Sequence, residues 1–472
     1  MNQSNSLERE CTFLIIGGGI AGVSCTETIS FLAPELKIIL ITESSLIKSV
    51  TNLTQLGKFT EQFDVAEINI KDYSKPNMEV ITDQLETIES NERIATTQSG
   101  IKINYKFMCL CTGARPKLIE HPELSAYILG IRDTESVIQF QKRIANAKKF
   151  VLVGNGGIAS EIAYEIGNIE IDWIIKDSFI TSTFIDQGAA KFFESNLNNK
   201  SKKIEKSVVK RMRYMEAKEQ GGLVNGAALG PDWHRLIEHT DKAAIKTNKN
   251  LNIHYRSEIK KISKNNDEHL IMVELTNGTQ IACDFIVSAT GVNSYRNFQC
   301  DKEFMLQPDD CIEVNELMKT SIDFIYAAGD CCTAGWEYSK FWFQKKLWTQ
   351  ARQMGAMAGK SMVAEHNQEP IYQDFCFELF SHVTKLYGYQ VVLLGKYNAQ
   401  GLDDNYDLLF RITPDKEYIK FVLFEGKLIG ALLIGETGLE ETCENLILNQ
   451  IDLTPYGDDI LDPNIDIEDY FD

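Results

Sequence analysis

Short apolar runs that end in glycine recur along the chain and predict the strands of an open α/β sheet. The first covers residues 13–16, a stretch with helical spacing follows, and residues 37–42 form a second apolar run. The same order of strand, turn, helix and strand returns over residues 150–175. Because this order is that of a βαβ unit, the pattern predicts two such units in one chain.

The pattern changes toward the C-terminus. Residues 271–275 and the following Asn277-Gly278 predict a hairpin, whereas residues 284–292 and 324–330 are apolar strands that end in a Gly turn. Beyond residue 369, apolar runs at 390–394 and 418–424 and a helical stretch near 439–448 predict a separate α+β domain of about a hundred residues.

The first βαβ unit carries a dinucleotide-binding fingerprint. Its strand ends in G-x-G-x-x-G, with Gly17, Gly19 and Gly22 at the glycine positions, and Glu43 follows the second strand. Gly17 permits the tight turn, Gly19 lets the backbone approach a pyrophosphate, and Gly22 lets the helix lie against the strand. Glu43 is then expected to bind ribose hydroxyls.

The second unit repeats the fingerprint as G-x-G-x-x-A, with Gly154, Gly156 and Ala159. Alanine is an accepted variant at the last position, where it packs the helix on the strand. Two fingerprints predict two bound nucleotides. An acid after the second strand favours NADH and a base favours NADPH, and Lys176 and Asp177 offer one of each, so the choice stays open.

Composition places the chain among water-soluble, multi-domain proteins. With 472 residues it is too long for one ordinary core, and no apolar run reaches the length of a bilayer span. The first ten residues are polar and lack the apolar segment of a signal peptide, so we expect no membrane association and a place in the cytosol or nucleus. In such a compartment the eleven cysteines are expected to be thiols, mostly buried.

The net charge of -19 is concentrated near the C-terminus, where residues 428–472 contain twelve acids and no Lys or Arg. Such a tail is either a solvated end or a segment that docks on a basic groove. Residues 200–213 hold seven Lys or Arg against one Glu. That run is either a solvated surface or a binding site for nucleic acid or an acidic protein, and we expect no direct nucleic-acid binding.

The glycine turns together resemble the FAD-dependent pyridine nucleotide-disulphide oxidoreductases, in order and spacing, over residues 11–365. The residues that carry the resemblance are Gly17-Gly18-Gly19-Ile20-Ala21-Gly22, Thr112-Gly113-Ala114-Arg115-Pro116, Gly154-Asn155-Gly156-Gly157, Ala289-Thr290-Gly291 and Ala327-Ala328-Gly329-Asp330. The resemblance implies an α/β fold with two Rossmann-like domains, the NAD(P) domain being inserted in the FAD domain. The implied segments are 10–145 (FAD, first part), 146–285 (NAD(P), with a charged insertion near 195–255), 286–365 (FAD, second part) and 366–472 (C-terminal α+β domain with the acidic tail).

The resemblance also implies the cofactors and the residues that bind them. FAD is expected as the bound cofactor and NAD(P)H as the co-substrate. The first fingerprint and Glu43 are expected to bind the adenosine diphosphate part of FAD, and Asp330 is expected to bind its ribityl chain. Gly154, Gly156 and Ala159 are expected to bind the nicotinamide nucleotide. The whole candidate set is Gly17, Gly18, Gly19, Ile20, Ala21, Gly22, Glu43, Thr112, Gly113, Gly154, Gly156, Ala159, Gly291, Gly329 and Asp330.

The chain departs from the disulphide reductases of this family. These carry a redox cysteine pair shortly after the first βαβ unit, but no cysteine occurs between Cys25 and Cys109. A dithiol relay of that kind is therefore not expected. Lys48 lies where flavin reductases without the pair often have a basic residue, and its ammonium could stabilise negative charge on a reduced flavin. The alternative for Lys48 is an ordinary surface lysine in a loop.

Two other pairs of cysteines are candidates for redox groups. Cys331 and Cys332 follow Asp330, at the expected start of a helix where a thiolate is favoured, and Cys109 and Cys111 alternate on a predicted strand and would share one face. Buried structural thiols are the expected interpretation of both pairs. His234 and His239 are the only two histidines at metal-ligand spacing, no cysteine stands near them, and we predict no metal.

The chain also resembles a narrower group within this family, over nearly its whole length. The residues that carry this second resemblance include Leu129-Gly130-Ile131-Arg132-Asp133, Ala228-Leu229-Gly230-Pro231-Asp232-Trp233-His234 and Leu347-Trp348-Thr349-Gln350-Ala351-Arg352-Gln353-Met354-Gly355. It implies an FAD-bound NAD(P)H oxidoreductase of nucleus and cytoplasm. It further implies association with the tRNA ligase complex, whose catalytic subunit it would protect from oxidation.

The expected reaction is hydride transfer from a nicotinamide to flavin, which makes the protein an FAD-dependent NAD(P)H oxidoreductase, placed by family near EC 1.8.1. Two alternatives stay open. A scaffold would use NAD(P)H-reduced flavin as a signal that permits partner binding. A dithiol reductase would need Cys331 or Cys332.

Overall fold

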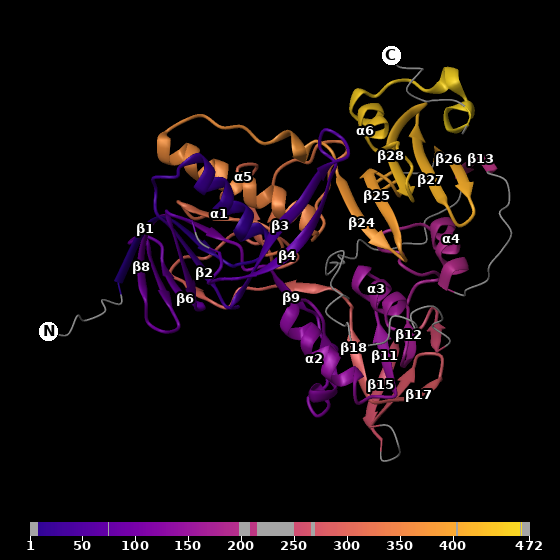
Figure 1. Ribbon diagram of the computed structural model, residues 1–472, viewed down its shortest axis with the longest axis horizontal. Coiled ribbons are helices and arrows are strands. Elements are labelled where there is room, and N and C mark those ends of the chain that lie inside the picture. The colour runs from indigo at the N-terminus through magenta and orange to yellow at the C-terminus, as the bar shows by residue number, and fades with distance from the viewer. Residues whose placement is uncertain are drawn as a thin grey trace. The chain divides into compact units, whose positions relative to one another are not determined.

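The computed structural model describes residues 8–73, 75–197, 208–214, 250–265, 270–402, 405–462 and 464. His234, His239, residues 228–234, the first part of the basic run and residues 465–472 of the acidic tail lie outside the described residues. The chain divides into two compact units (Figure 1). The first comprises the chain up to Thr54, Phe63–Arg115 and Asn293–Glu378; the second comprises Gln55–Gln62, Pro116–Val292 and the chain from Leu379 onward.

The first unit is built on an eight-stranded sheet with a parallel centre. Strands β1 (Glu8–Ile16), β2 (Ile38–Thr42), β5 (Met78–Thr82) and β8 (Lys102–Leu110) run parallel in the order β8-β1-β2-β5, and β22 (Ile325–Ala327) pairs parallel with β8. The remaining strands continue beyond β8 in the order β7 (Ile94–Thr97), β6 (Leu85–Glu89) and β20 (Gln299–Cys300). This sheet therefore combines strands from residues 8–110 with two strands, β20 and β22, that come much later in the sequence.

Two helices lie together on this unit, α1 (Ile20–Leu32) and α5 (Trp348–Asn367) (Figure 1). Gly355 and Gly359 of α5 let them approach closely. A Cβ at Gly355 would lie 2.2 Å from the Ala21 carbonyl oxygen, and one at Gly359 would lie 2.9 Å from that of Cys25. The shorter pairs are β3 (Leu46–Gln55) with β4 (Glu61–Asn69), β21 (Ile312–Val314) with β23 (Cys332–Ala334), and β9 (Ala114–Pro116) with β19 (Val292–Ser294).

The second unit contains a five-stranded parallel sheet. Its order is β10 (Ile128–Gly130), β18 (Phe285–Ser288), β11 (Lys149–Val153), β12 (Glu170–Ile174) and β14 (Leu251–His254). The accompanying helices are α2 (Thr134–Ile144), α3 (Gly157–Glu165) and α4 (Gln187–Leu197). The three-stranded antiparallel sheet β15 (Ile259–Lys264), β16 (Ile271–Leu275) and β17 (Gln280–Cys283) contains the predicted hairpin, whose turn holds Gly278 at φ 85°.

A six-stranded antiparallel sheet completes the second unit. Its order is β13 (Val208–Tyr214), β26 (Tyr406–Thr413), β27 (Glu417–Phe424), β28 (Lys427–Ile434), β25 (Tyr389–Gly395) and β24 (Ser381–Leu386), with α6 (Glu440–Asn449) against it. Short 3-10 helices lie at Ser125–Tyr127, Phe375–Phe377, Thr454–Tyr456 and Asp459–Leu461. None of the helices within the described ranges is long and apolar enough to cross a bilayer.

The observed units differ from the predicted segments in several places; for example, the chain from Leu379 onward belongs to the unit of the second parallel sheet and is not a separate unit. Two further differences have a clear cause in strand pairing. Residues 116–145 lie in the second unit because β10 pairs with β18 along Ile128–Gly130, so the predicted boundary at 145/146 does not coincide with the end of the first unit. Strand β13 comes from the predicted charged insertion but pairs with β26 of the C-terminal sheet. Both differences arise from pairing between segments far apart in the sequence.

Candidate functional site

The first fingerprint forms a tight turn between β1 and α1. Gly17 has φ 118°, a conformation that favours glycine, and a Cβ there would lie 2.1 Å from the carbonyl oxygen of Cys111. A Cβ at Gly22 would lie 1.9 Å from the Gly17 carbonyl oxygen, whereas one at Gly19 would meet no atom within 4 Å. Gly17 and Gly22 are thus required by packing, and Gly19 leaves open space beside the backbone.

The N-terminus of α1 fits a phosphate group. Its N-cap residue is Gly19, no side chain caps it, and its first turn contains no acid. Gly18 precedes it on the Thr42 side of the turn, and Ile20 and Ala21, the first helical residues, are buried. The first amides of the helix therefore have no side-chain acceptor, which is the arrangement that binds a pyrophosphate.

Residues at the ends of β2 and β8 border this turn. Glu43 accepts a hydrogen bond from Arg115 Nη2 at 3.1 Å, and both side chains are about half exposed. The Thr112 hydroxyl donates to the Tyr295 carbonyl oxygen at 2.6 Å, and Gly113 has φ 69° with no atom within 4 Å of a Cβ. Arg115 also stacks over the Tyr295 ring at 3.7 Å. The predicted ribose-binding acid is thus already paired with a cation.

Gly329 lies between the first fingerprint and the first turn of α5, and Asp330 follows it in the chain. Gly329 has φ 81°, and its Cβ position lies 2.8 Å from the Cβ of Ala21 and 3.7 Å from that of Ala351. Asp330 is buried. The N-cap of α5 has no side-chain hydrogen bond and its first turn has no acid. A second uncapped helix start therefore lies beside the predicted FAD-binding loop.

The helix expected directly after Asp330 is not there. Cys332–Ala334 form β23, which pairs with β21, and α5 starts only at Trp348. The proposal that Cys331 and Cys332 stand at a helix N-terminus is therefore wrong. Both side chains are fully buried, and burial raises the pKa of the Cys332 thiol well above its usual value. The hydrogen bond with Cys332 lowers the pKa of the Cys331 thiol, but neither of these buried sulfur atoms is accessible to a substrate.

Cys109, in β8, and Cys111, directly after the end of that strand, lie side by side, as their alternation predicts. Their sulfur atoms are 3.5 Å apart, and both side chains are buried. The hydrogen bond with Cys109, together with burial, holds the pKa of the Cys111 thiol well above its usual value. These two residues are therefore core thiols behind the first fingerprint.

Lys48 lies on a strand rather than in a loop. It is in β3, its backbone N donates to the Gly18 carbonyl oxygen at 2.9 Å, and its side chain is 22% exposed. Its ammonium lies 5.4 Å from the centre of the Trp348 ring and 4.0 Å from the Glu67 carboxylate. The main chain therefore fixes Lys48 to the turn of the first fingerprint, and its cation faces the first residue of α5.

The second fingerprint repeats the geometry of the first. Gly154 has φ 127°, and its Cβ position lies 2.1 Å from the Ala289 carbonyl oxygen, just as Gly17 approaches Cys111. The strand triplet β18-β11-β12 repeats β8-β1-β2, and Gly291 has φ 109° where Gly113 has 69°. Gly156 is the N-cap of α3 without a side-chain cap, and Ala159 is fully buried against the strand.

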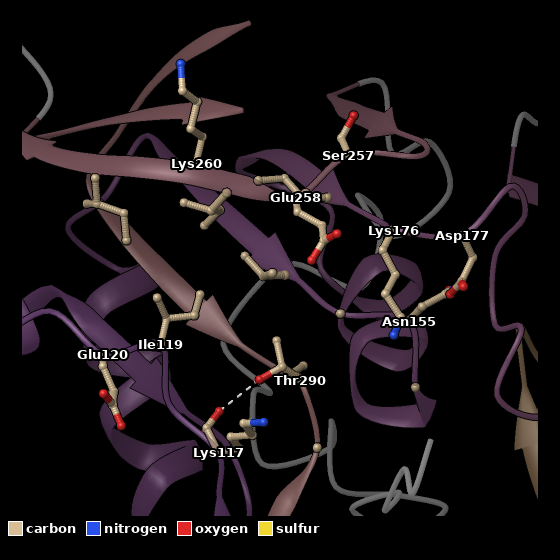
Figure 2. Close-up of a pocket in the computed structure, with 18 of the residues that line it drawn as sticks. Lys117, Ile119, Glu120, Asn155, Lys176, Asp177, Ser257, Glu258, Lys260 and Thr290 are labelled. Carbon is tan, nitrogen blue, oxygen red and sulfur yellow. Dashed lines mark hydrogen bonds between the residues drawn. The ribbon is translucent and has the colours of Figure 1, made fainter. Parts of the chain in front are cut away.

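A pocket of about 740 Å³ opens at this second turn. Figure 2 shows Asn155, Lys176 and Asp177 at one end of it and Lys117, Glu120 and Thr290 at another. The lining includes the glycines of the turn, Gly154, Gly156 and Gly291. A concave site with glycine turns and convergent polar groups has the character of a nucleotide pocket.

Asn155 organises one wall of this pocket, a role that the sequence did not indicate. Its Nδ2 donates to Asp177 Oδ2 at 2.8 Å and to the Phe179 carbonyl oxygen at 2.9 Å, and its Oδ1 accepts from the Thr181 backbone N at 2.5 Å. Thr181 has φ 58° and is fully buried. The x position of the fingerprint thus fixes the loop that follows β12.

Within the part of the chain that the structure describes, no group of three His, Cys, Asp or Glu has the geometry of a metal site. His234 and His239 are outside that part. The absence of a metal therefore stays a prediction.

Comparison with known proteins identifies the family. The sequence model of the pyridine nucleotide-disulphide oxidoreductases matches residues 12–221 and 235–355. A protein of Drosophila melanogaster, pyridine nucleotide-disulfide oxidoreductase domain-containing protein 1, is 49% identical over 474 residues, which cover 99% of this chain and 100% of that protein. The Homo sapiens protein of the same name is 45% identical over 492 residues, covering 98% of each.

Solved structures show the same fold. The ferredoxin reductase for the CYP199A2 system from Rhodopseudomonas palustris gives a TM-score of 0.68 at 17% identity, covering 97% of this chain and 99% of that one. An NAD-dependent persulfide reductase from A. fulgidus gives 0.65 at 16% identity, covering 94% and 78%. The predicted α/β fold with two Rossmann-like domains is thereby confirmed. The comparisons indicate an oxidoreductase of the FAD and NAD(P)H type, and the chain belongs to the pyridine nucleotide-disulphide oxidoreductase family.

Proposed function

We propose that this protein is an FAD-dependent NAD(P)H oxidoreductase that works without the redox cysteine pair of its family. The observation that carries the proposal is the doubled fingerprint. Gly17 and Gly154 have the same left-handed conformation and the same close approach to a neighbouring strand, and each precedes a helix without a side-chain cap. Two equivalent phosphate sites in one chain fit two nucleotides, one held as cofactor and one exchanged as substrate.

The residues around the first turn would hold FAD. The uncapped start of α1 would bind the pyrophosphate, Glu43 the adenosine ribose, and buried Asp330 the ribityl chain. The residues assigned to this site are Gly17, Gly18, Gly19, Ile20, Ala21, Gly22, Glu43, Thr112, Gly113, Gly329 and Asp330. Around the second turn, Gly154, Gly156, Ala159 and Gly291 would hold NAD(P)H. Bound FAD would supply the two-electron acceptor for the hydride of NAD(P)H.

The cysteines do not support a dithiol relay. No cysteine occurs between Cys25 and Cys109, where the family pair is expected. The remaining candidates, Cys331 and Cys332, are fully buried. The electrons are therefore proposed to leave for an acceptor outside the protein rather than for a disulfide within it.

The test is an anaerobic titration of the purified protein with NADH and NADPH, followed by its visible spectrum. A yellow protein that bleaches, or that forms a charge-transfer band, on addition of either nucleotide supports the proposal. Bound flavin that responds to neither nucleotide would show that the sites do not act in one reaction. Colourless protein that takes up no FAD would refute the assignment of the first site.

Lys48→Met is expected to slow reduction of the flavin by NAD(P)H about tenfold or more and to lower its reduction potential. The reason is that the Lys48 ammonium is the positive charge fixed to the FAD-binding turn through Gly18, and an ammonium in a preorganised site stabilises developing negative charge. The measurements are stopped-flow reduction and the potential against a reference dye. Lys106→Met, at an exposed position on β8, is the control. An unchanged potential would remove Lys48 from the catalytic machinery.

We also propose, from the resemblance of the motifs, that the protein associates with the tRNA ligase complex in nucleus and cytoplasm and protects its catalytic subunit from oxidation. An FAD-linked NAD(P)H oxidoreductase has the chemistry to maintain a reducing environment at a partner. The test is co-purification of the two proteins with and without NAD(P)H, together with ligase activity after exposure to oxygen. Loss of ligase activity at the same rate with and without this protein would reject the protective role.

A further inference from the structure

We infer that the second nucleotide site selects a nicotinamide nucleotide with a 2′-phosphate, and that Lys176 is the residue that recognises this phosphate. The inference deepens the proposed function and rests on it for the identity of the nucleotide. It chooses NADPH where the sequence left both donors open.

The first step compares the two βαβ units. Gly17 N donates to the Ile41 carbonyl oxygen at 2.8 Å, and Gly154 N donates to that of Ile174 at 3.2 Å. Because these bonds join equivalent points of the two turns, the residue two places after each acceptor is also equivalent. Glu43 in the first unit thus corresponds to Lys176 in the second.

This correspondence decides the sign of the charge at the ribose. In the dinucleotide-binding fold an acid at this position binds the ribose 2′-hydroxyl, and a cation nearby accommodates a 2′-phosphate. The first site has the acid Glu43, as expected for a nucleotide without a 2′-phosphate. The second site has the cation Lys176, and Asp177 is one position further on.

Asp177 does not replace the missing acid, because the loop already uses its carboxylate. Its Oδ2 accepts from Asn155 Nδ2 at 2.8 Å and from the Ser182 hydroxyl at 2.7 Å. Asn155 is itself fixed through Phe179 and Thr181. Both donors hold Oδ2 of this carboxylate to the residues of the loop, and Asp177 stands one position beyond the point that Glu43 occupies in the first unit.

Lys176 remains available for a phosphate. It lines the pocket and is exposed, and its ammonium has no hydrogen bond or ion pair with any residue in the described ranges. Lys260, in contrast, is paired with Glu274 at 2.6 Å and points away from Lys176, and Lys117 lies at another end of the pocket (Figure 2). Of the three lysines labelled there, Lys176 alone stands beside the loop after β12.

The test measures binding rather than turnover. Full-length protein loaded with FAD is titrated calorimetrically with 2′,5′-ADP and with 5′-AMP, which differ only in the 2′-phosphate. Wild-type protein is expected to bind 2′,5′-ADP at least tenfold more tightly. Lys176→Met is expected to weaken 2′,5′-ADP binding about ten- to hundredfold, the range for a hydrogen bond to a charged group, and to leave 5′-AMP binding unchanged.

Two matched variants and the pH provide the controls. Lys117→Met removes a cation from another end of the same pocket and is expected to leave the preference intact. Lys176→Arg keeps the charge and is expected to retain it. The second pKa of such a phosphate is about 6. The preference of the wild-type protein for 2′,5′-ADP should therefore decrease when the pH is lowered from about 7.5 to about 5.5, whereas Lys176→Met should show little change. Equal binding of the two ligands by wild-type protein, or an equal loss for both in Lys176→Met, would overturn the inference.

The outcomes separate this inference from the proposed function. A Lys176-dependent preference for 2′,5′-ADP, combined with flavin that neither NADPH nor NADH reduces, would sustain the phosphate site and reject the oxidoreductase proposal. Reduction of the flavin by NADH, combined with no preference for 2′,5′-ADP, would sustain the oxidoreductase and reject the role of Lys176.

Discussion

Gly17→Ala is expected to yield protein that carries no flavin and is strongly destabilised. Gly17 has φ 118°, and the added Cβ would lie 2.1 Å from the Cys111 carbonyl oxygen, a distance at which the backbone must move. A left-handed non-glycine residue costs about 1–3 kcal/mol, and the clash adds to that cost. Since domains have only about 5–15 kcal/mol of stability, we expect a loss of about 3 kcal/mol or more in the free energy of unfolding. Urea unfolding and the ratio of FAD to protein measure both effects.

Gly19→Ala separates the two contributions of the fingerprint, to the fold and to the cofactor. Gly19 has φ -78°, which alanine adopts readily, and its Cβ would meet no atom within 4 Å. The free energy of unfolding without FAD should therefore change by no more than about 0.5 kcal/mol. The methyl group would occupy the space where the pyrophosphate approaches α1, so FAD affinity should fall about tenfold or more.

Gly278→Ala is the matched control for this pair. Gly278 also has a left-handed backbone, φ 85°, and open space at its Cβ, but it lies in the turn between β16 and β17. It should lose about 1 kcal/mol of stability and keep its FAD. If Gly19→Ala bound FAD as tightly as wild-type protein, the turn at Gly19 would not be the pyrophosphate site.

The elements that the sequence predicted well are those encoded by local patterns. Both βαβ units, the Asn277-Gly278 hairpin and the strands and helix after residue 369 occur near the predicted residues. Each depends on hydrophobic spacing and on glycine at a turn, signals that lie within a few residues of the element itself. The glycines of both fingerprints follow from the same rule, because a short turn requires a backbone that other residues rarely adopt.

The features that were missed depend on contacts between distant segments. The apolar run before Cys331 gave no indication that residues 332–334 would pair with β21 instead of starting a helix. Strand β13 pairs with β26, almost two hundred residues later, although its sequence is a basic run typical of a solvated surface. The equivalence of Lys176 and Glu43 depends on the backbone hydrogen bonds of the two turns, which follow from the fold and not from local sequence.

Glu444 is another residue whose role comes only from the fold, and its replacement is expected to destabilise the second unit strongly. It lies in α6 and is fully buried. Its Oε2 accepts from the backbone N of Thr60 at 3.0 Å and from the Thr60 hydroxyl at 2.7 Å, and its Oε1 accepts from the backbone N of Phe59 at 2.9 Å. A Cβ at Gly57 would lie 2.6 Å from the same carboxylate, so residues 57–60 wrap closely around it.

Glu444→Ala is expected to lower the free energy of unfolding by about 3–5 kcal/mol, because two buried donors and one partly buried donor would lose their acceptor at once. Glu444→Gln should cost less than alanine, because the amide oxygen still accepts, but its NH2 group would face donors that it cannot satisfy. Thr60→Ala removes only one of the three bonds, and about 1 kcal/mol is expected for it. Urea unfolding of the three variants gives the comparison. A loss for Glu444→Ala no larger than that for Thr60→Ala would show that the two backbone amides find other acceptors, and that the carboxylate does not hold residues 57–60 in place.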